Sequence, residues 1–160
     1  MNPSDENTPK IKVCLVEDHH ATRESFIKLL RHAEAIVCVG ACSDGNEALA
    51  KIPQLSPDVV LMDINLPGHS GIECVRTLKQ HHPQIEFVML TTYDDTDLIL
   101  DALRAGASGY LLKRTAPEEW VDAIKDGPPR RLAHVDGNRA AGRLPFPPHP
   151  PTFTGGRQAQ

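Results

Sequence analysis

Acidic side chains follow two apolar runs of this sequence, at the point where each run ends. The run 13–16 leads into Glu17 and Asp18, and the run 59–62 leads into Asp63. If the two runs are neighbouring strands, the three carboxylates lie close together, repel one another and require a cation. Hard carboxylate oxygens with room for water suit Mg²⁺. The spacing therefore predicts a magnesium site built from these three acids.

Two further apolar runs end in groups that suit phosphoryl chemistry. The run 87–90 leads into Thr91, and the run 110–112 leads into Lys113. A carboxylate such as Asp63 can attack a phosphoryl group and hold it as an aspartyl phosphate. That reaction depends mostly on positioning and charge neutralisation, which the ammonium of Lys113 and the hydroxyl of Thr91 would provide. The turn residues "NLPGHSG" that follow shortly after Asp63 predict a loop that a phosphodonor can reach.

A regular alternation of strand and helix patterns accounts for the position of these groups. Five short apolar runs are typical of strands buried on both faces, and they span 13–16, 36–39, 59–62, 87–90 and 110–112. Amphipathic helix patterns fill the intervals, around 26–30, 48–55, 72–78, 98–103 and 120–124. The alternation predicts an α/β fold, a parallel sheet with right-handed crossovers and helices on both faces. Five units suggest the flavodoxin-like strand order 2-1-3-4-5, with a ligand site between the first and third strands.

Capping boxes mark three of the predicted helix starts. In this motif a polar acceptor is followed three residues later by glutamate, and each side chain satisfies a backbone N–H group of the other residue. The three pairs are Asp44 with Glu47, Ser70 with Glu73, and Thr115 with Glu118. They predict helices that begin directly after Asp44, Ser70 and Thr115.

Charge and composition divide the chain near residue 127. The 160 residues carry a net charge of −4, but residues 127–160 hold five arginines and one acid, so the first 126 residues carry −8. Residues 127–160 also contain seven prolines and five glycines, and such a segment buries too little apolar surface to offset its ordering entropy. We predict a disordered N-terminus over 1–9, one domain over 10–126 and a disordered tail over 127–160. The abrupt onset of arginine and proline also favours a frameshift product as the origin of the tail.

The sequence argues against several classes of protein. No apolar stretch approaches the length of a membrane span, and the polar start lacks a signal-peptide core, so a cytoplasmic location is expected. No GxGxxG follows the first strand, which argues against a dinucleotide site. The cysteines match no zinc spacing, and we interpret them as buried thiols; they are Cys14, Cys38, Cys42 and Cys74.

Taken together, the motifs resemble the response-regulator receiver domain of bacterial two-component signalling, and the NarL/LuxR type in particular. The resemblance covers about residues 10–126 and rests on the segments "VEDH", "MDINLPGHSGIE", "MLTTYDD" and "ALRAGASGYLLK", which occur in this order. It implies a CheY-like fold and a Mg²⁺ cofactor. The metal ligands that it implies are Glu17, which stands where aspartate is the commoner residue, Asp18, Asp63 and the backbone carbonyl of Asn65.

The resemblance also implies a role for the other site residues. Asp63 is the phosphoacceptor, Lys113 contacts the phosphoryl group, and Thr91 and Tyr110 form a switch pair. The implied phosphodonor is a sensor histidine kinase, and the domain relays a signal instead of acting as an enzyme, apart from slow self-dephosphorylation. The chain departs from many receivers at Arg114, which follows Lys113 where proline is common.

The resemblance extends to partners and output. We predict that switching acts through a face formed by the helix around 98–103, the strand 110–112 and the helix around 120–124, and this face is the candidate surface for a homodimer. NarL/LuxR-type regulators control transcription through a helix-turn-helix domain that follows the receiver. Residues 127–160 contain no amphipathic helix pair and seven prolines, so we expect no DNA binding from this chain alone.

Two other functions fit parts of the pattern. A haloacid-dehalogenase-type phosphatase also forms an aspartyl phosphate, but that class carries the motif Asp-x-Asp at the nucleophile. Here Asn65 stands two residues after Asp63, and the chain has no room for a cap domain. A protein–protein module that no longer takes phosphate is disfavoured because Asp63, Thr91 and Lys113 are all present.

Overall fold

The structure is a computed structural model that describes residues 9–92 and 96–125. The predictions of disorder concern residues 1–9 and 127–160, and of these only Pro9 is among the described residues. The inferred frameshift origin of the tail likewise concerns residues outside the described ranges. No helix within the two described ranges combines the length and the apolar character that crossing a bilayer requires.

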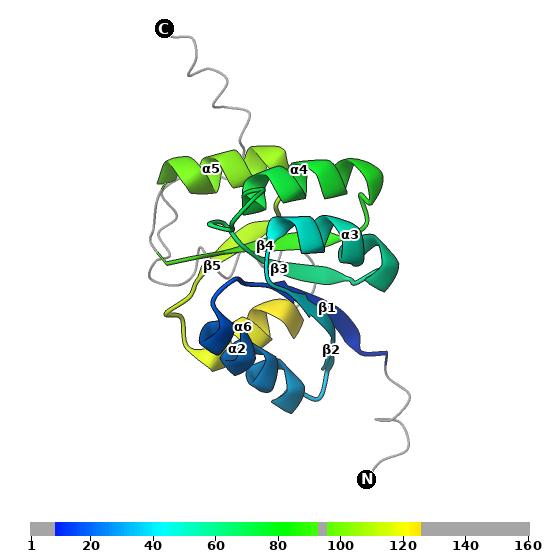
Figure 1. Ribbon diagram of the computed structural model, residues 1–160. Coiled ribbons are helices and arrows are strands. Elements are labelled where there is room, and N and C mark those ends of the chain that lie inside the picture. The colour runs from blue at the N-terminus through cyan, green and yellow to red at the C-terminus, as the bar shows by residue number, and fades with distance from the viewer. Residues whose placement is uncertain (1–8, 93–95, 126–160) are drawn as a thin grey trace, which may run out of the picture.

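Five parallel strands form one sheet at the centre of the domain (Figure 1). They are β1 (Ile11–Val16), β2 (Ile36–Cys42), β3 (Val59–Asp63), β4 (Glu86–Thr91) and β5 (Gly109–Leu112). The spatial order is β2-β1-β3-β4-β5, which confirms the predicted flavodoxin-like order. Because β1 and β3 are neighbours and run parallel, the residues at their carboxyl ends meet at one edge of the sheet.

Helices cover both faces of this sheet, as predicted (Figure 1). On one face lie α3 (Gly45–Leu55), α4 (Gly71–His81) and α5 (Thr96–Ala105). On the other face lie α2 (His20–His32) and α6 (Pro117–Lys125). The predicted arrangement, a parallel sheet with helices on both faces, is therefore confirmed.

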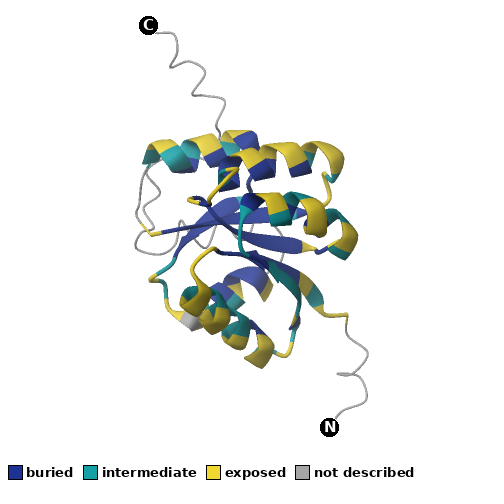
Figure 2. Ribbon diagram, viewed as in Figure 1, coloured by how far each residue is buried: buried dark blue, intermediate teal, exposed yellow. Residues whose placement is uncertain are grey.

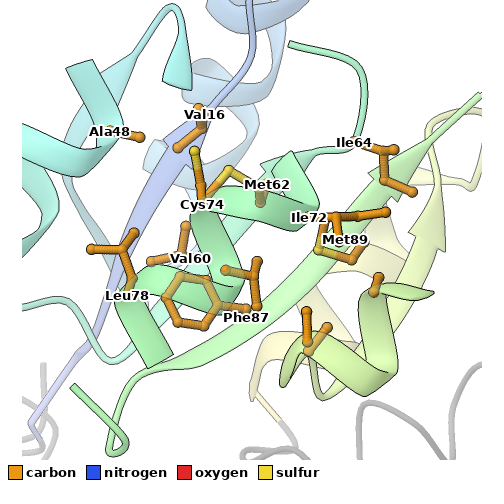
Figure 3. Packing of buried hydrophobic residues seen from close by; sticks show 14 of the residues in the cluster. Val16, Ala48, Val60, Met62, Ile64, Ile72, Cys74, Leu78, Phe87 and Met89 are labelled. Carbon is orange, nitrogen blue, oxygen red and sulfur yellow. The ribbon is translucent and has the colours of Figure 1, made fainter. Parts of the chain in front are cut away.

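Strand side chains alternate between two hydrophobic cores, because successive residues of a strand point to opposite faces. In β1, Val13 and Leu15 belong to the core beneath α2 and α6, whereas Cys14 and Val16 belong to the core beneath α3, α4 and α5. Figure 3 shows this second core, in which strand residues such as Val60 pack against α4. The central strands are buried along most of their length (Figure 2).

Strand β2 contradicts the prediction that every strand is buried on both faces. It lies at the edge of the sheet, and among the described strands it pairs only with β1. Val37 is 38% exposed, and Cys38 is half-buried, whereas the other three cysteines are buried as predicted. The strand also continues to Cys42, beyond the predicted end at residue 39. An apolar run predicts a strand, but it does not distinguish a central strand from an edge strand.

The predicted helix starts at Asp44 and Ser70 are confirmed. The Asp44 carboxylate accepts a hydrogen bond from the Glu47 N–H group at 2.8 Å, and Ser70 Oγ accepts one from the Glu73 N–H group at 3.2 Å. The Glu73 carboxylate in turn accepts a hydrogen bond from the Ser70 N–H group, which completes the capping box. This second cap fixes the end of the loop that follows Asp63.

The third predicted helix start is wrong by one residue. Helix α6 begins at Pro117, whereas a cap at Thr115 would make Ala116 the first helical residue. The carbonyl of Ala116 accepts hydrogen bonds from the N–H groups of Glu119 and Trp120. Proline suits the first helical position because its φ is already helical and the N–H group it lacks would have no partner there. The proline therefore decides this start, in place of the capping-box spacing.

Candidate functional site

The three acids predicted to bind metal lie together at the carboxyl edge of the sheet. Glu17 directly follows β1, and Asp63 is the last residue of the neighbouring strand β3. One carboxylate oxygen from each of Glu17, Asp18 and Asp63 lies within 4.8 Å of the other two. Glu17 and Asp63 are buried, with 0% and 3% exposure, whereas Asp18 is exposed. The structure thus brings the three acids together, and their role as metal ligands stays a prediction.

Lys113 lies between two of these carboxylates. Its Nζ is 2.7 Å from Glu17 Oε1 and 3.1 Å from Asp63 Oδ2. The lysine directly follows β5, and its backbone N–H group donates to the Thr91 carbonyl at 2.9 Å, which extends the pairing of β4 with β5. Because β4 separates β3 from β5, a long side chain is needed to reach the end of β3. The ammonium group therefore offsets part of the negative charge of the acids.

The surroundings of Glu17 fit a divalent cation. Its Oε2 accepts a hydrogen bond from the His19 N–H group at 3.0 Å. Its Oε1 is buried and lies 2.7 Å from the Lys113 ammonium. A buried carboxylate beside two further carboxylates forms the kind of hard-oxygen donor set that Mg²⁺ prefers.

Close backbone contacts shape the loop that follows Asp63. The Asn65 N–H group donates to Asp63 Oδ1 at 3.1 Å, and the Gly71 N–H group donates to the Ile64 carbonyl at 2.9 Å. A Cβ atom at Gly71 would lie only 2.1 Å from the carbonyl oxygen of Asp63, so glycine is required where α4 begins. Gly68 has a φ of +81°, a conformation that favours glycine. The predicted metal contact of the Asn65 carbonyl stays a prediction.

Burial and neighbouring charges set the protonation of the site. Burial raises the pKa of Asp63 to about 6, the Lys113 ammonium opposes this rise, and the Glu17 carboxylate adds to it. Burial alone would lower the pKa of Lys113, but its contacts with the two carboxylates raise the pKa above the ordinary value for lysine. At neutral pH the lysine is therefore charged, and Asp63 is mostly ionised.

Thr91 and Tyr110 lie on adjacent strands and face the same side of the sheet. Tyr110 pairs with Met89, and Thr91 lies two residues after Met89 in β4. Residues two apart in a strand point to the same face, as do directly paired residues. Both side chains are buried, with 3% exposure for Thr91 and 2% for Tyr110. The predicted switch pair is therefore neighbouring and buried, and its switching role stays a prediction.

Two residues near the acids have contacts that the sequence did not reveal. Arg23 Nη1 donates to the carbonyl of Glu17 at 2.9 Å. His19 is exposed, and its Nδ1 accepts a hydrogen bond from the Thr22 N–H group at the start of α2. No local motif signals a side chain that reaches back from a helix to the strand before it. The only signal is the short distance in sequence between the end of the strand and the arginine.

The chain is similar to proteins of one family over most of its described length. Residues 13–125 match the family model of the response regulator receiver domain. The chain is 40% identical over 119 residues to the transcriptional regulatory protein YxjL of Bacillus subtilis, a match that covers 74% of this chain and 55% of that protein. It is 38% identical over 135 residues to the DNA-binding transcriptional activator DevR/DosR of Mycobacterium tuberculosis, covering 84% of this chain and 61% of that protein.

Solved structures with similar sequences share the fold. A two-component response regulator of the LuxR family from Aurantimonas sp. SI85-9A1 superposes with a TM-score of 0.71 at 30% identity. That match covers 84% of this chain and 92% of the other. The chain spans about half the length of the curated relatives it matches.

Proposed function

The chain belongs to the response regulator receiver family, and on this premise we propose that it accepts a phosphoryl group on Asp63. One observation carries the proposal: the Asp63 carboxylate lies at the carboxyl edge of the sheet, 3.1 Å from the Lys113 ammonium and beside two further acids. This arrangement combines a nucleophile, a fixed positive charge and a set of cation ligands. Phosphoryl transfer needs these three components and little other chemistry.

In the proposed reaction Asp63 is the nucleophile. One of its carboxylate oxygens attacks the phosphorus atom of the donor, and the bond from phosphorus to the leaving group breaks, with its electron pair passing to that group. The pKa of about 6 leaves Asp63 mostly ionised, and so able to attack, at neutral pH. Lys113 would neutralise charge on the phosphoryl oxygens, and the Thr91 hydroxyl would donate a hydrogen bond to one of them.

Mg²⁺ is the proposed cofactor. Glu17, Asp18 and Asp63 would hold it through carboxylate oxygens, and Asn65 would hold it through its backbone carbonyl. When bound, the ion neutralises negative charge on the phosphoryl oxygens. The close grouping of the three carboxylates, with one oxygen of each within 4.8 Å of the other two, supports this assignment.

We propose that phosphorylation acts on Thr91 and Tyr110. A phosphoryl group adds charge and acceptor oxygens at Asp63, which should draw the Thr91 hydroxyl towards it. Tyr110 lies on the same face of the next strand, so the position of its ring would depend on the space that Thr91 leaves. The surface formed by α5, β5 and α6 would then change, and it is the proposed homodimer face.

The proposed phosphodonor is the phosphohistidine of a sensor histidine kinase, because receivers operate in two-component systems with such kinases. The relatives named above are transcriptional regulators, and we propose regulation of transcription as the output, in the cytoplasm. The described residues form a receiver fold, so DNA binding would depend on residues or partners outside them. A haloacid-dehalogenase-type phosphatase is not favoured, because Asn65 takes the place of the second acid.

Intact-mass measurement with a small phosphodonor tests the proposal. Wild-type protein incubated with acetyl phosphate and Mg²⁺ should gain the mass of one phosphoryl group, and a chelator should prevent the gain. Asp63→Asn should gain none. Asp58→Asn is the matched control, because Asp58 is an exposed acid directly before β3 that accepts a hydrogen bond from the Lys12 N–H group, and it should gain the mass. A full gain in Asp63→Asn would contradict the assignment.

A further inference from the structure

We propose that Arg23 is a positioning residue: its guanidinium holds the backbone of Glu17 and Asp18 so that both carboxylates face Asp63. Arg23 lies in the first turn of α2, directly after the segment that carries the two acids. The inference rests on the proposed function of Asp63 and adds to it a residue that contacts neither the phosphoryl group nor the metal.

The guanidinium joins the end of β1 to the start of α2. Nη1 donates to the Glu17 carbonyl at 2.9 Å and, over a longer 3.5 Å, to the Asp18 carbonyl. Nη2 lies 3.1 Å from His20 Nδ1, the first residue of the helix. One side chain therefore contacts the backbone of both acids and is itself held by the helix.

Strand pairing of β1 ends just before Glu17 and Asp18, whose carbonyl groups Arg23 contacts. β1 ends at Val16, and the Glu17 N–H group makes the last sheet-like hydrogen bond, to the Cys42 carbonyl at 3.0 Å. The carbonyl of Glu17 accepts no backbone hydrogen bond from the residues that the structure describes. A carbonyl next to a buried side chain requires a donor, and Arg23 supplies it from outside the sheet.

The Asp18 carboxylate depends most on this backbone contact. The Glu17 carboxylate is held directly, by the His19 N–H group and by Lys113. The Asp18 carboxylate is exposed and makes no hydrogen bond or ion pair within residues 9–92 and 96–125, yet it lies within 4.8 Å of the carboxylates of Glu17 and Asp63. Because no other residue of the described chain holds this side chain, the position of its backbone, which Arg23 contacts at 3.5 Å, is the constraint that keeps it near the other two acids.

Charge and geometry predict opposite effects of removing Arg23. No carboxylate of the described chain lies within ion-pair distance of its guanidinium, whose contacts are two carbonyls and a histidine nitrogen. If only charge mattered, loss of this positive group would strengthen the binding of a cation nearby. A positioning role gives the opposite sign, because loss of groups that orient metal ligands typically weakens metal affinity by about 10- to 100-fold.

A Mg²⁺ titration of Arg23→Gln by calorimetry tests the proposal. Its Kd for Mg²⁺ should rise by about 10- to 100-fold over wild type. Arg31→Gln is the matched control, since it removes the same charge from an exposed position on the same helix, and its Kd should stay near the wild-type value. With acetyl phosphate, the Mg²⁺ concentration for half-maximal phosphorylation of Arg23→Gln should rise in parallel, while the rate at saturating Mg²⁺ stays close to that of wild type.

A Kd for Mg²⁺ in Arg23→Gln that is unchanged or lower would overturn the proposal. If the rate at saturating Mg²⁺ is also reduced in that case, Arg23 has a general structural role instead. If circular dichroism shows that Arg23→Gln is unfolded, Arg23→Lys replaces it, because a lysine ammonium can satisfy one carbonyl. Its Kd should then be raised, and a wild-type value would overturn the proposal. Wild-type protein that binds no Mg²⁺ would contradict the proposed function of Asp63 instead.

Discussion

Replacement of Asp63 by asparagine should stabilise the metal-free fold at neutral pH, although it removes an ion pair. Burial raises the pKa of Asp63 from 3.8 to about 6, so the folded chain favours the neutral form of this carboxyl. One pKa unit corresponds to about 1.4 kcal/mol, so the ionised carboxylate destabilises the fold by about 3 kcal/mol above pH 6. Asparagine carries no charge and avoids this penalty. Lys113 keeps a partner in the variant, because Glu17 Oε1 lies 2.7 Å from its Nζ.

The stability advantage of Asp63→Asn over wild type should grow as the pH rises. Below about pH 4 the carboxyl is neutral in both the folded and the unfolded chain, so the advantage of Asp63→Asn disappears. As the pH rises through 4 to 6, the wild-type fold loses stability relative to the variant. The advantage should be about 1 kcal/mol near pH 4.5 and about 3 kcal/mol near pH 7.5.

Urea unfolding in the presence of a chelator measures this difference. The fluorescence of Trp120, the only tryptophan, reports unfolding because the side chain is buried. Asp58→Asn, which removes an exposed carboxylate, should show no gain at either pH. Equal stability of wild type and Asp63→Asn near pH 7.5, or a gain that does not shrink towards pH 4.5, would refute the reasoning. Mg²⁺ should stabilise wild type more than the variant, because binding to the folded state adds to its stability.

Three other substitutions test separate contacts. Gly71→Ala should lower the free energy of unfolding by about 1–3 kcal/mol, because its Cβ would lie 2.1 Å from the Asp63 carbonyl oxygen; an unchanged melting temperature would contradict this. Lys113→Met leaves the buried Glu17 and Asp63 without their cation, so urea unfolding near neutral pH should show a loss of about 3 kcal/mol, and no loss would count against the ion pairs. Thr91→Ala should still gain a phosphoryl mass but lose the phosphorylation-dependent dimerisation proposed for the face of α5, β5 and α6, as measured by sedimentation; dimerisation that persists would rule out Thr91 as the coupling group.

The strand order and the meeting of the acids could be predicted because they depend on patterns that recur along the chain. Four of the five apolar runs lead directly into a polar residue, and the carboxyl ends of parallel strands share one edge. Glu17 and Asp63 therefore had to lie close together once β1 and β3 were neighbours. The reach of Lys113 across the end of β4 follows from the same topology and from the length of its side chain.

Other features depend on contacts that leave no periodic signal. Val37 is exposed because β2 is an edge strand, and an apolar run looks the same at the edge and at the centre of a sheet. The start of α6 was predicted from the spacing after Thr115, but the proline at 117 decides it. In the sequence Arg23 has the features of an ordinary helix residue. Its contact with the Glu17 carbonyl depends on the conformation of the turn between β1 and α2, which the sequence pattern does not specify.

The most direct test of the central claim is to locate the phosphoryl group on the chain. Borohydride reduces an aspartyl phosphate to homoserine, and peptide mass spectrometry then identifies the residue that was modified. Wild-type protein treated with acetyl phosphate and Mg²⁺ should contain homoserine at position 63, and omission of Mg²⁺ or of the phosphodonor should remove it. A reduced residue at Asp18 or at any other acid, with Asp63 unmodified, would contradict the assignment of Asp63 as the phosphoacceptor.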